Sequence, residues 1–341
     1  MTLTAGYDIG GAHLKVALVE AGRVVDVRQI VCLLWRGLDH LDAALAEALA
    51  FTVPATRQAV TMTGELADVF PDRYTGVARI VERTRAALGG DCRFYMGPHG
   101  FGSADDALAH HGDVASANFL ASATLAAREQ RDGLLIDMGS TTTDIIPFKA
   151  GAVIARGLSD GERLRTGELV YTGLTRTPVM AVTTRGLFQG HWQTLARDAF
   201  ATMADVRRVL GDLPADVDQH ATSDGRGKSV EESRARLARC FGRDALPGED
   251  ADWSASAAMI AEEQLFSLIN GCQQVLRGAG LPDDARVVTA GIGTEVAAGV
   301  AAHLGREVVT FGALVTAPPD VALWATRCAP AVAVALLLGE V

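Results

Sequence analysis

Residues 5–19 read AGYDIGGAHLKVALV, and residues 134–146 read LLIDMGSTTTDII. Each stretch predicts a short strand that ends in an aspartate, a glycine-containing turn and a second strand. The aspartate and the glycine have the same spacing in both stretches, as Asp8/Gly10 and Asp137/Gly139. A supersecondary unit that recurs far along the same chain predicts two similar domains that face each other.

Between and beyond these hairpins, strand-like and helix-like segments alternate, which predicts a parallel or mixed sheet with helices on its faces. Helices are expected at 39–51, 74–88, 115–130 and 255–276, and strands at 58–63, 93–96, 153–155 and 286–289. The fold class is therefore α/β with two domains and a central cleft. We expect the first domain at 1–128 plus 321–341 and the second at 129–320, with a cleft-capping insertion at about 212–252.

Length, composition and net charge limit the kind of protein this can be and the kind of partner it can bind. A chain of 341 residues exceeds what one hydrophobic core comfortably supports, and 49% hydrophobic residues exclude a disordered protein. The formal net charge of −10 argues against nucleic acid as a partner, because a phosphate backbone needs a basic surface. A small anion such as a diphosphate remains compatible, since a few cations and backbone amides suffice to bind it.

Two further features indicate a cytoplasmic protein without a membrane partner. The five cysteines are scattered and form no C-x-x-C pair, which is typical of reduced thiols. The first residues lack the pattern of a signal peptide, and the apolar run at 329–338 is about half of a membrane span. We expect that run to form a buried helix. A homo-oligomer is compatible with the sequence, which does not decide it.

The glycine turns predict a phosphate site. Glycine lets successive N–H groups point at an anion without an intervening side chain. Asp8 and Asp137 are expected on opposite walls of the cleft, where carboxylates hold a Mg²⁺ that bridges phosphate oxygens. One such hairpin is ordinary, but two copies and a late TAGIG turn at 289–293 favour the phosphate cleft. The expected phosphate-binding residues are Gly10, Gly11, Lys15, Gly139, Ser140, Thr141 and Thr142.

The order of these motifs resembles the actin, hexokinase and hydantoinase/oxoprolinase superfamily. Further stretches are similar to the branch that makes methanofuran in methanogens, with counterparts in methylotrophic bacteria. That branch is also labelled a tetrahydromethanopterin-linked C1-transfer pathway protein. The resemblance covers nearly the whole chain and rests on MTGEL (62–66), DVASANFLA (113–121), GELVYTG (167–173), RTP (176–178), FATMADV (200–206) and TSDGRGKS (222–229).

The resemblance implies a synthase that joins an aminomethylfuran-methyl diphosphate to the phenol of γ-glutamyltyramine. The products would be an ether and diphosphate, with Mg²⁺ as the cofactor; in methylotrophs a tyrosine derivative is the implied acceptor. Magnesium and cations must then absorb the charge that develops on the leaving oxygen. Asp144 joins Asp8 and Asp137 as a candidate on the metal side, and Arg226 and Lys228 join Lys15 as candidate leaving-group cations.

A base must also take the proton of the phenol, whose free pKa is about 10. Glu65 and Glu168 are the candidates, and the sequence does not choose between them. Asn118, Tyr171 and Arg176 are candidate substrate-binding residues, although the last two could equally brace their loop.

Two alternative functions stay open. An ATP-using kinase or oxoprolinase-like amidohydrolase of the same fold would place a nucleotide near the TAGIG turn. His13 weakens that reading, because many kinases of the superfamily have serine or threonine at this point. A non-catalytic scaffold of the same pathway is the other alternative. The adjacent His110 and His111 point apart on regular structure, so we expect no metal site there.

Overall fold

The computed structural model describes residues 3–53 and 55–340. Its first sheet has the strand order β3-β2-β1-β4-β5-β6. Antiparallel pairing joins β1 to β2 and β2 to β3, and parallel pairing joins β1 to β4 and β4 to β5. The strands are β1 (Leu3–Ile9), β2 (His13–Glu20), β3 (Arg23–Val31), β4 (Arg57–Met62), β5 (Arg93–Tyr95) and β6 (Phe101–Gly102).

Helices cover both faces of the first sheet. One face packs against α1 (Leu38–Thr52) and α2 (Arg73–Leu88), whose apolar sides form a shared core with the strands. The other face carries α13 (Ala329–Gly339), which is apolar almost all round and buried. The helix lies so close to β1 that a Cβ at Gly6 would come within 2.1 Å of a backbone oxygen of Ala331. Shorter elements are η1 (Leu34–Arg36), η2 (Gly97–His99), α3 (Ala104–Ala109) and α4 (His111–Val114).

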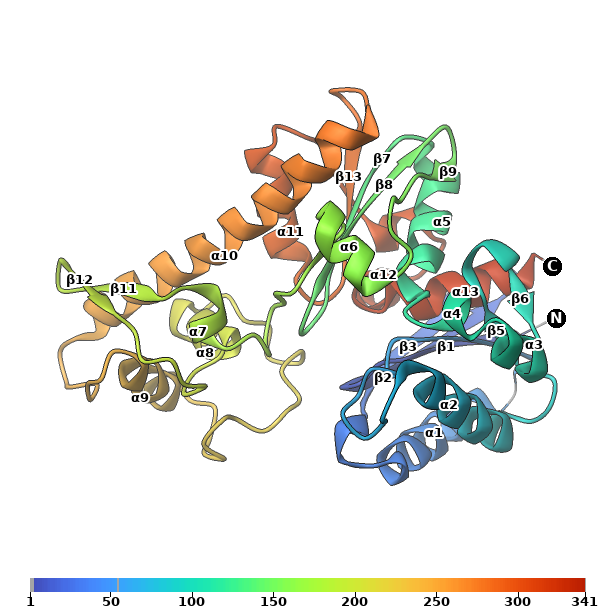
Figure 1. Ribbon diagram of the computed structural model, residues 1–341, viewed down its shortest axis with the longest axis horizontal. Helices are drawn as coiled ribbons and strands as arrows, with labels where there is room; N and C mark the ends of the chain where they lie inside the picture. Colours follow the sequence, from blue (N-terminus) through green and yellow to red (C-terminus); the bar gives the residue numbers. More distant parts are fainter. Residues whose placement is uncertain (1–2, 54, 341) are drawn as a thin grey trace.

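The second sheet has the order β10-β8-β7-β13-β14, with β9 paired to β8. Its strands are β7 (Gly133–Met138), β8 (Thr143–Lys149), β9 (Ala152–Val153), β10 (Leu169–Val170), β13 (Arg286–Ala290) and β14 (Val308–Thr310). The helical elements around it are α5 (Asn118–Gln130), α6 (Asp160–Thr166), α10 (Asp250–Ala279), α11 (Thr294–His303), η3 (Phe311–Leu314) and α12 (Pro319–Arg327). The two sheets form the two α/β domains seen in Figure 1.

The two hairpins have matching turns, as their sequences predict. The Gly10 N–H donates to the carbonyl of His13 at 3.0 Å, and the Gly139 N–H donates to the carbonyl of Thr142 at 2.9 Å. The same bond at the same offset places each aspartate at the end of its strand and each turn at the same edge of its sheet. The predicted α/β architecture with one hairpin at the start of each sheet is confirmed.

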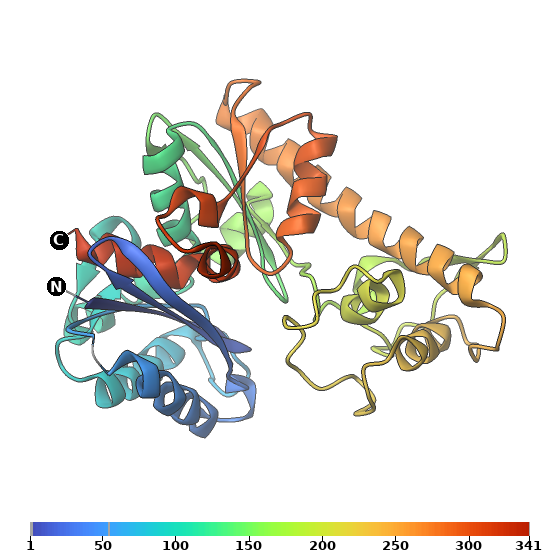
Figure 2. The same ribbon diagram turned by 180° about the vertical axis from the view of Figure 1, so that it is seen from behind.

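A third unit, which we call the side lobe (residues 176–261), projects from the second domain (Figures 1 and 2). It contains α7 (Val179–Val182), β11 (Arg185–Phe188), β12 (His191–Thr194), α8 (Met203–Leu210), α9 (Val230–Cys240) and the first part of α10. Its own core includes Phe188, whose ring lies 4.3 Å from that of Trp253. The insertion expected at 212–252 is therefore part of a larger unit, because the strands at 185–194 close a separate core.

The structure also differs from the expected boundary between the domains at residue 128. Helix α5, assigned from sequence to the first domain, packs against β7, β8 and β9 of the second sheet and against α13. It begins at Asn118 and not at Ala115, because Ser116 has a φ of 54° and interrupts the helix. Buried alanines on two sides let α5 lie between the domains.

Within the described residues, no single helix is long and apolar enough to cross a membrane. The pair α12 and α13 has the length and composition when taken together, but the two helices are bent by 104°.

Candidate functional site

A cavity of about 570 Å³, which we call the main cavity, opens between the two glycine turns. Its residues come from both domains, and its volume is in the usual range for a small-molecule site. The predicted residues that line it are Asp8, Gly10, Gly11, Lys15, Asn118, Asp137, Gly139, Ser140, Thr141, Thr142, Asp144, Tyr171 and Arg176. Glu65, Glu168, Arg226 and Lys228 do not line it.

Asp8 and Lys15 form an ion pair on the wall of the first domain. They face each other across β1 and β2, and the Lys15 Nζ lies 3.3 Å from Asp8 Oδ2. Burial alone would lower the pKa of Lys15, but the carboxylates of Asp8 and Asp137 raise it above its ordinary value. Asp8 Oδ1 is buried and has no hydrogen-bond partner among the described residues. It is therefore available to a further cation.

Asp137 faces this pair from the second domain. Burial raises its pKa to about 7, the charge of Lys15 opposes that rise, and Asp144 and Asp8 add to it. The TAGIG turn lies behind this aspartate: a Cβ at Gly291, whose φ is 80°, would come within 2.5 Å of Asp137 Oδ1. The late glycine turn therefore supports Asp137 and does not line the main cavity.

Arg163 is a cavity residue that the sequence analysis missed. It is only 3% exposed, pairs with Asp144, and donates to Asp160 Oδ1 at 2.8 Å. Its guanidinium carbon lies 3.9 Å from the centre of the Phe119 ring. Burial raises the pKa of Asp144, and Arg163 opposes that rise. The signal was the capping box that begins with Ser159, which predicts a helix start and places residue 163 in its first turns.

Glu65 lies behind the cavity wall and is connected to it through Ser116. Ser116 lines the cavity, and its hydroxyl donates to Glu65 Oε1 at 2.7 Å. Glu65 is fully buried, its Oε2 has no partner among the described residues, and burial raises its pKa. Ser116 adopts a φ of 54°, which is unfavourable for a side-chain-bearing residue and is typical of functional positions.

Glu168, the other candidate base, has a structural position. Its carboxylate accepts from the backbone N–H groups of Arg156 at 2.7 Å and Gly157 at 2.9 Å. The Thr166 hydroxyl donates to the same carboxylate at 2.8 Å. With both oxygens occupied and no exposed surface, Glu168 fixes the loop before α6 and does not reach the main cavity.

An aromatic cluster lines the part of the main cavity that is formed by Trp35, His13 and Arg176. Arg176 lies over Trp35, with its guanidinium carbon 4.6 Å from the ring centre, and donates to Thr141 Oγ1 at 3.3 Å. The rings of His13 and His220 are 4.5 Å apart. Burial lowers the pKa of His13 to about 2 and that of His220 to about 4, so both imidazoles are neutral near pH 7. Sequence reasoning missed Trp35 and His220, because the side lobe brings them together.

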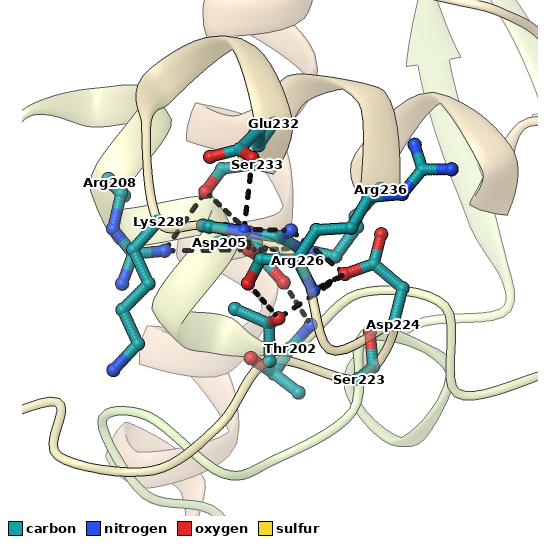
Figure 3. Close-up of polar contacts among 12 residues, drawn as sticks. Thr202, Asp205, Arg208, Ser223, Asp224, Arg226, Lys228, Glu232, Ser233 and Arg236 are labelled. Atoms are coloured by element: carbon teal, nitrogen blue, oxygen red, sulfur yellow. Dashed lines mark hydrogen bonds and ion pairs between the residues drawn. The ribbon is translucent and has the colours of Figure 1, made fainter.

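Arg226 and Lys228 lie on the side lobe (Figure 3). Arg226 is exposed, and Lys228 Nζ donates to the Asp218 carbonyl at 2.6 Å. Their loop is held by the fully buried Arg236, which donates to Asp224 Oδ1 and to the Gly227 carbonyl, each at 3.1 Å. The structure does not bring these two cations to the main cavity, so their placement gives no support to a leaving-group role.

A second histidine cluster lies outside the main cavity. The rings of His99 and His110 are 4.8 Å apart, and each imidazole has a nitrogen 3.5 Å from Asp113 Oδ2. His111 instead contacts the Tyr74 ring. The adjacent histidines therefore do point apart, but His110 meets a distant histidine that the sequence did not indicate.

The residues of the main cavity fit a magnesium ion. Asp8 and Asp137 supply hard oxygen ligands, and Asp8 Oδ1 lacks a partner among the described residues. The raised pKa of Asp137 reflects burial and an excess of carboxylates, both of which a divalent cation would offset. The N–H groups of Ser140 and Thr141 have no backbone acceptor among the described residues and are free to bind an anion beside the metal.

Comparison with known proteins shows the family of the chain. The model of the hydantoinase/oxoprolinase family matches residues 57–323. A (4-{4-[2-(γ-L-glutamylamino)ethyl]phenoxymethyl}furan-2-yl)methanamine synthase of Methanocaldococcus jannaschii is 31% identical over 294 residues, which are 85% of this chain and 86% of that protein. A synthase of the same name from Methanococcus vannielii is 33% identical over 165 residues, covering 48% of this chain and 72% of that protein.

Solved structures share the fold at low identity. An acetone carboxylase in a nucleotide-free structure has a TM-score of 0.56 and 11% identity, covering 96% of this chain and 70% of that one. A ROK-family glucokinase from Streptomyces griseus, in complex with glucose and AMPPNP, has a TM-score of 0.50 and 14% identity, with 98% of both chains covered. The chain has the actin and sugar-kinase fold that its motifs predict.

Proposed function

The chain belongs to the hydantoinase/oxoprolinase family, in the branch of the two archaeal synthases, and from that premise we propose that it forms the ether bond of a methanofuran-type cofactor. Its substrates are an aminomethylfuran-methyl diphosphate and a phenol, and its products are the ether and diphosphate. The observation that carries this proposal is the main cavity, in which Lys15 pairs with Asp8, is under the charge of Asp137, and lines the same space as the two glycine turns.

The reaction is balanced without a further co-reactant. The phenol oxygen forms a bond to the furfuryl carbon, the bond from that carbon to the diphosphate oxygen breaks, and the phenol proton passes to a base. Charge grows on the leaving oxygen, so groups that meet it there stabilise the transition state more than the ground state. Lys15 supplies a full positive charge, and the free N–H groups of Ser140 and Thr141 supply dipoles.

A bound magnesium ion would neutralise the diphosphate, with Asp8 and Asp137 as its protein ligands. Arg163 keeps Asp144 paired, so that this third carboxylate adds less repulsion to the anion.

The geometry favours Glu65 over Glu168 as the base. Ser116 lines the main cavity and its hydroxyl donates to Glu65 Oε1, so this hydroxyl is the relay that would pass a proton from the phenol to the carboxylate. Burial raises the pKa of Glu65, which makes its carboxylate a stronger base. Both oxygens of Glu168 already accept hydrogen bonds from the protein, and Glu168 does not line the main cavity.

The alternative functions are not favoured, because both archaeal relatives are named as synthases. The test is to incubate the purified protein with the furfuryl diphosphate, Mg²⁺ and candidate phenols, and to identify products by mass spectrometry. We expect one ether whose mass equals the sum of the two substrates minus diphosphoric acid. A protein that is folded but forms no ether with any phenol would refute the proposal.

A further inference from the structure

A second cavity of about 330 Å³ lies next to the main cavity. Trp35 and Arg176 line both cavities, so these two side chains form a shared part of their walls. The side lobe and the segment around η1 form its other walls. A ligand long enough to pass Trp35 can therefore have one end in each cavity.

Three of the sequence stretches singled out above meet at the second cavity. Arg176 comes from the RTP stretch, Thr202 from FATMADV, and Thr222 and Ser223 from TSDGRGKS. The proposed ether-forming chemistry uses neither of the last two stretches. Figure 3 shows that they lie side by side on the side lobe, held together by Arg236. The lobe thus presents their polar groups on one surface.

The charges of this cavity favour an anionic group. Three arginines and two aspartates line it. Arg208 is paired with both aspartates, at 2.5 Å from Asp218 Oδ2 and 3.5 Å from Asp205 Oδ1. Arg36 and Arg176 have no carboxylate partner in the part of the chain that the structure describes. A guanidinium matches a carboxylate with two parallel hydrogen bonds, so each of these two arginines is suited to bind one.

The hydroxyl groups of the same cavity favour a cationic neighbour for that carboxylate. Ser223 Oγ donates to the Phe200 carbonyl at 2.6 Å, and Thr222 Oγ1 donates to the Arg226 carbonyl at 2.7 Å. Because their hydrogens are committed, these oxygens can only accept from a ligand. An ammonium group is a donor without an acceptor, which makes it the complementary group. A ligand that carries both a carboxylate and an ammonium group is an amino acid.

His220 adds to this polar wall. Both of its ring nitrogens are buried and have no hydrogen-bond partner among the described residues. The neutral imidazole can donate with one nitrogen and accept with the other, which suits a ligand with both kinds of group.

We propose that the second cavity binds the α-amino-acid end of the phenolic acceptor. The carboxylate lies at Arg36 and Arg176, the ammonium lies at the hydroxyl oxygens of Thr222 and Ser223, and the phenol ring passes Trp35 so that its hydroxyl reaches the main cavity. This assignment rests on the proposed function, because that function makes the acceptor a phenol. Two acceptors share this chemistry, a γ-glutamylated tyramine and tyrosine itself.

The test measures binding in the absence of the diphosphate substrate. Titration calorimetry is carried out with γ-L-glutamyltyramine and with 4-aminobutyryltyramine, which differs only by the missing carboxylate. Tyrosine and tyramine form a second pair that differs in the same way. We expect at least one carboxylate-bearing phenol to bind about tenfold more tightly than its partner, and the pair that shows this identifies the acceptor.

Arg36→Gln supplies the matched variant. Arg36 is exposed, so its substitution leaves the fold intact, and we expect it to remove most of the preference for the carboxylate. Arg79→Gln, at an exposed arginine on α2, is the control and should keep the preference. Equal affinities within both pairs of phenols, or full preference in Arg36→Gln, would overturn the assignment.

This experiment separates the two proposals. Carboxylate-selective binding without ether formation would support the second cavity and refute the proposed function. Ether formation without selectivity would support the function and refute the second cavity as the amino-acid site.

Discussion

The ammonium of Lys15 lies 3.3 Å from the carboxylate of Asp8, and both side chains face the main cavity. The pair is pre-formed by strand register, because residues 8 and 15 are direct partners across β1 and β2. Lys15 therefore needs no rearrangement to meet an anion, and the free Oδ1 of Asp8 remains on the same wall for a metal.

We expect Asp8→Asn and Asp137→Asn each to lower diphosphate-releasing turnover by a factor of about 100 or more, since each removes a carboxylate that we propose as a ligand of Mg²⁺. Turnover is measured by diphosphate release, and folding by circular dichroism. Asp91→Asn, at an exposed aspartate, is the control and should behave as wild type. Normal turnover in both cavity variants would rule out the metal assignment.

The pKa of Asp137 predicts a pH dependence of stability. Because the folded protein raises this pKa from 3.8 to about 7, it binds the proton more tightly than the unfolded chain does. The resulting stabilisation is complete below about pH 4 and is lost as the pH rises to about 7. In EDTA, Asp137→Asn should raise the melting temperature by several degrees at pH 8 and change it little at pH 4. If the difference in melting temperature between the two proteins were the same at pH 4 and at pH 8, the raised pKa of Asp137 would be contradicted.

The two buried glutamates should differ in what their substitution costs. Glu65→Gln should lower turnover about 100-fold and remove the acid limb of the pH profile of kcat/KM, because it removes the proposed base. Glu168→Gln should instead cost about 3 kcal/mol of stability, since an amide nitrogen would face backbone donors. Its turnover per folded molecule should stay close to wild type. The reverse result would exchange the two assignments.

The energy source of the reaction gives a further prediction. A diphosphate substrate carries its own leaving group, so turnover should proceed unchanged without ATP and release one diphosphate per ether. Chelation of Mg²⁺ should stop it, and restored Mg²⁺ should rescue it. A strict requirement for ATP, with ADP as product, would indicate that the hairpins bind a nucleotide.

Substitution of two arginines of the side lobe should affect stability to very different extents. Arg226→Ala removes an exposed side chain and should change stability by no more than about 0.5 kcal/mol, with normal turnover. Arg236→Met leaves Asp205 and Asp224 without their buried partner and should cost about 3–5 kcal/mol in chemical denaturation. A large loss of turnover in folded Arg226→Ala would restore its predicted phosphate role.

The hairpins could be predicted from sequence because their signals are local. Each is fixed by an apolar strand, an aspartate and a glycine turn within about 15 residues, and the same local reasoning located α1, α2 and β13. The helix predicted at 255–276 proved longer, because α10 continues into the side lobe, where Trp253 packs in a separate core.

The rest of the site depends on contacts between distant segments. Trp35 and His220 are 185 positions apart, and no local pattern indicates that their rings lie 5.7 Å from each other. Arg226 and Lys228 show the opposite error. Their glycine-rich context is similar to that of a phosphate loop, but the glutamate and arginine side chains of α9 already occupy its backbone groups.

Helix α10 runs without a break from the core of the side lobe to the core of the second domain (Figure 2). Its 30 residues give the helix a length of about 45 Å, at a rise of about 1.5 Å per residue. Because α10 packs in both cores, the side lobe and the second domain should move together as one rigid body. A rotation of about 5° between the two domains would move its far end by about 4 Å, which is roughly one side-chain layer. The second cavity lies between the side lobe and the segment around η1 of the first domain, so its width should change with the angle between the domains.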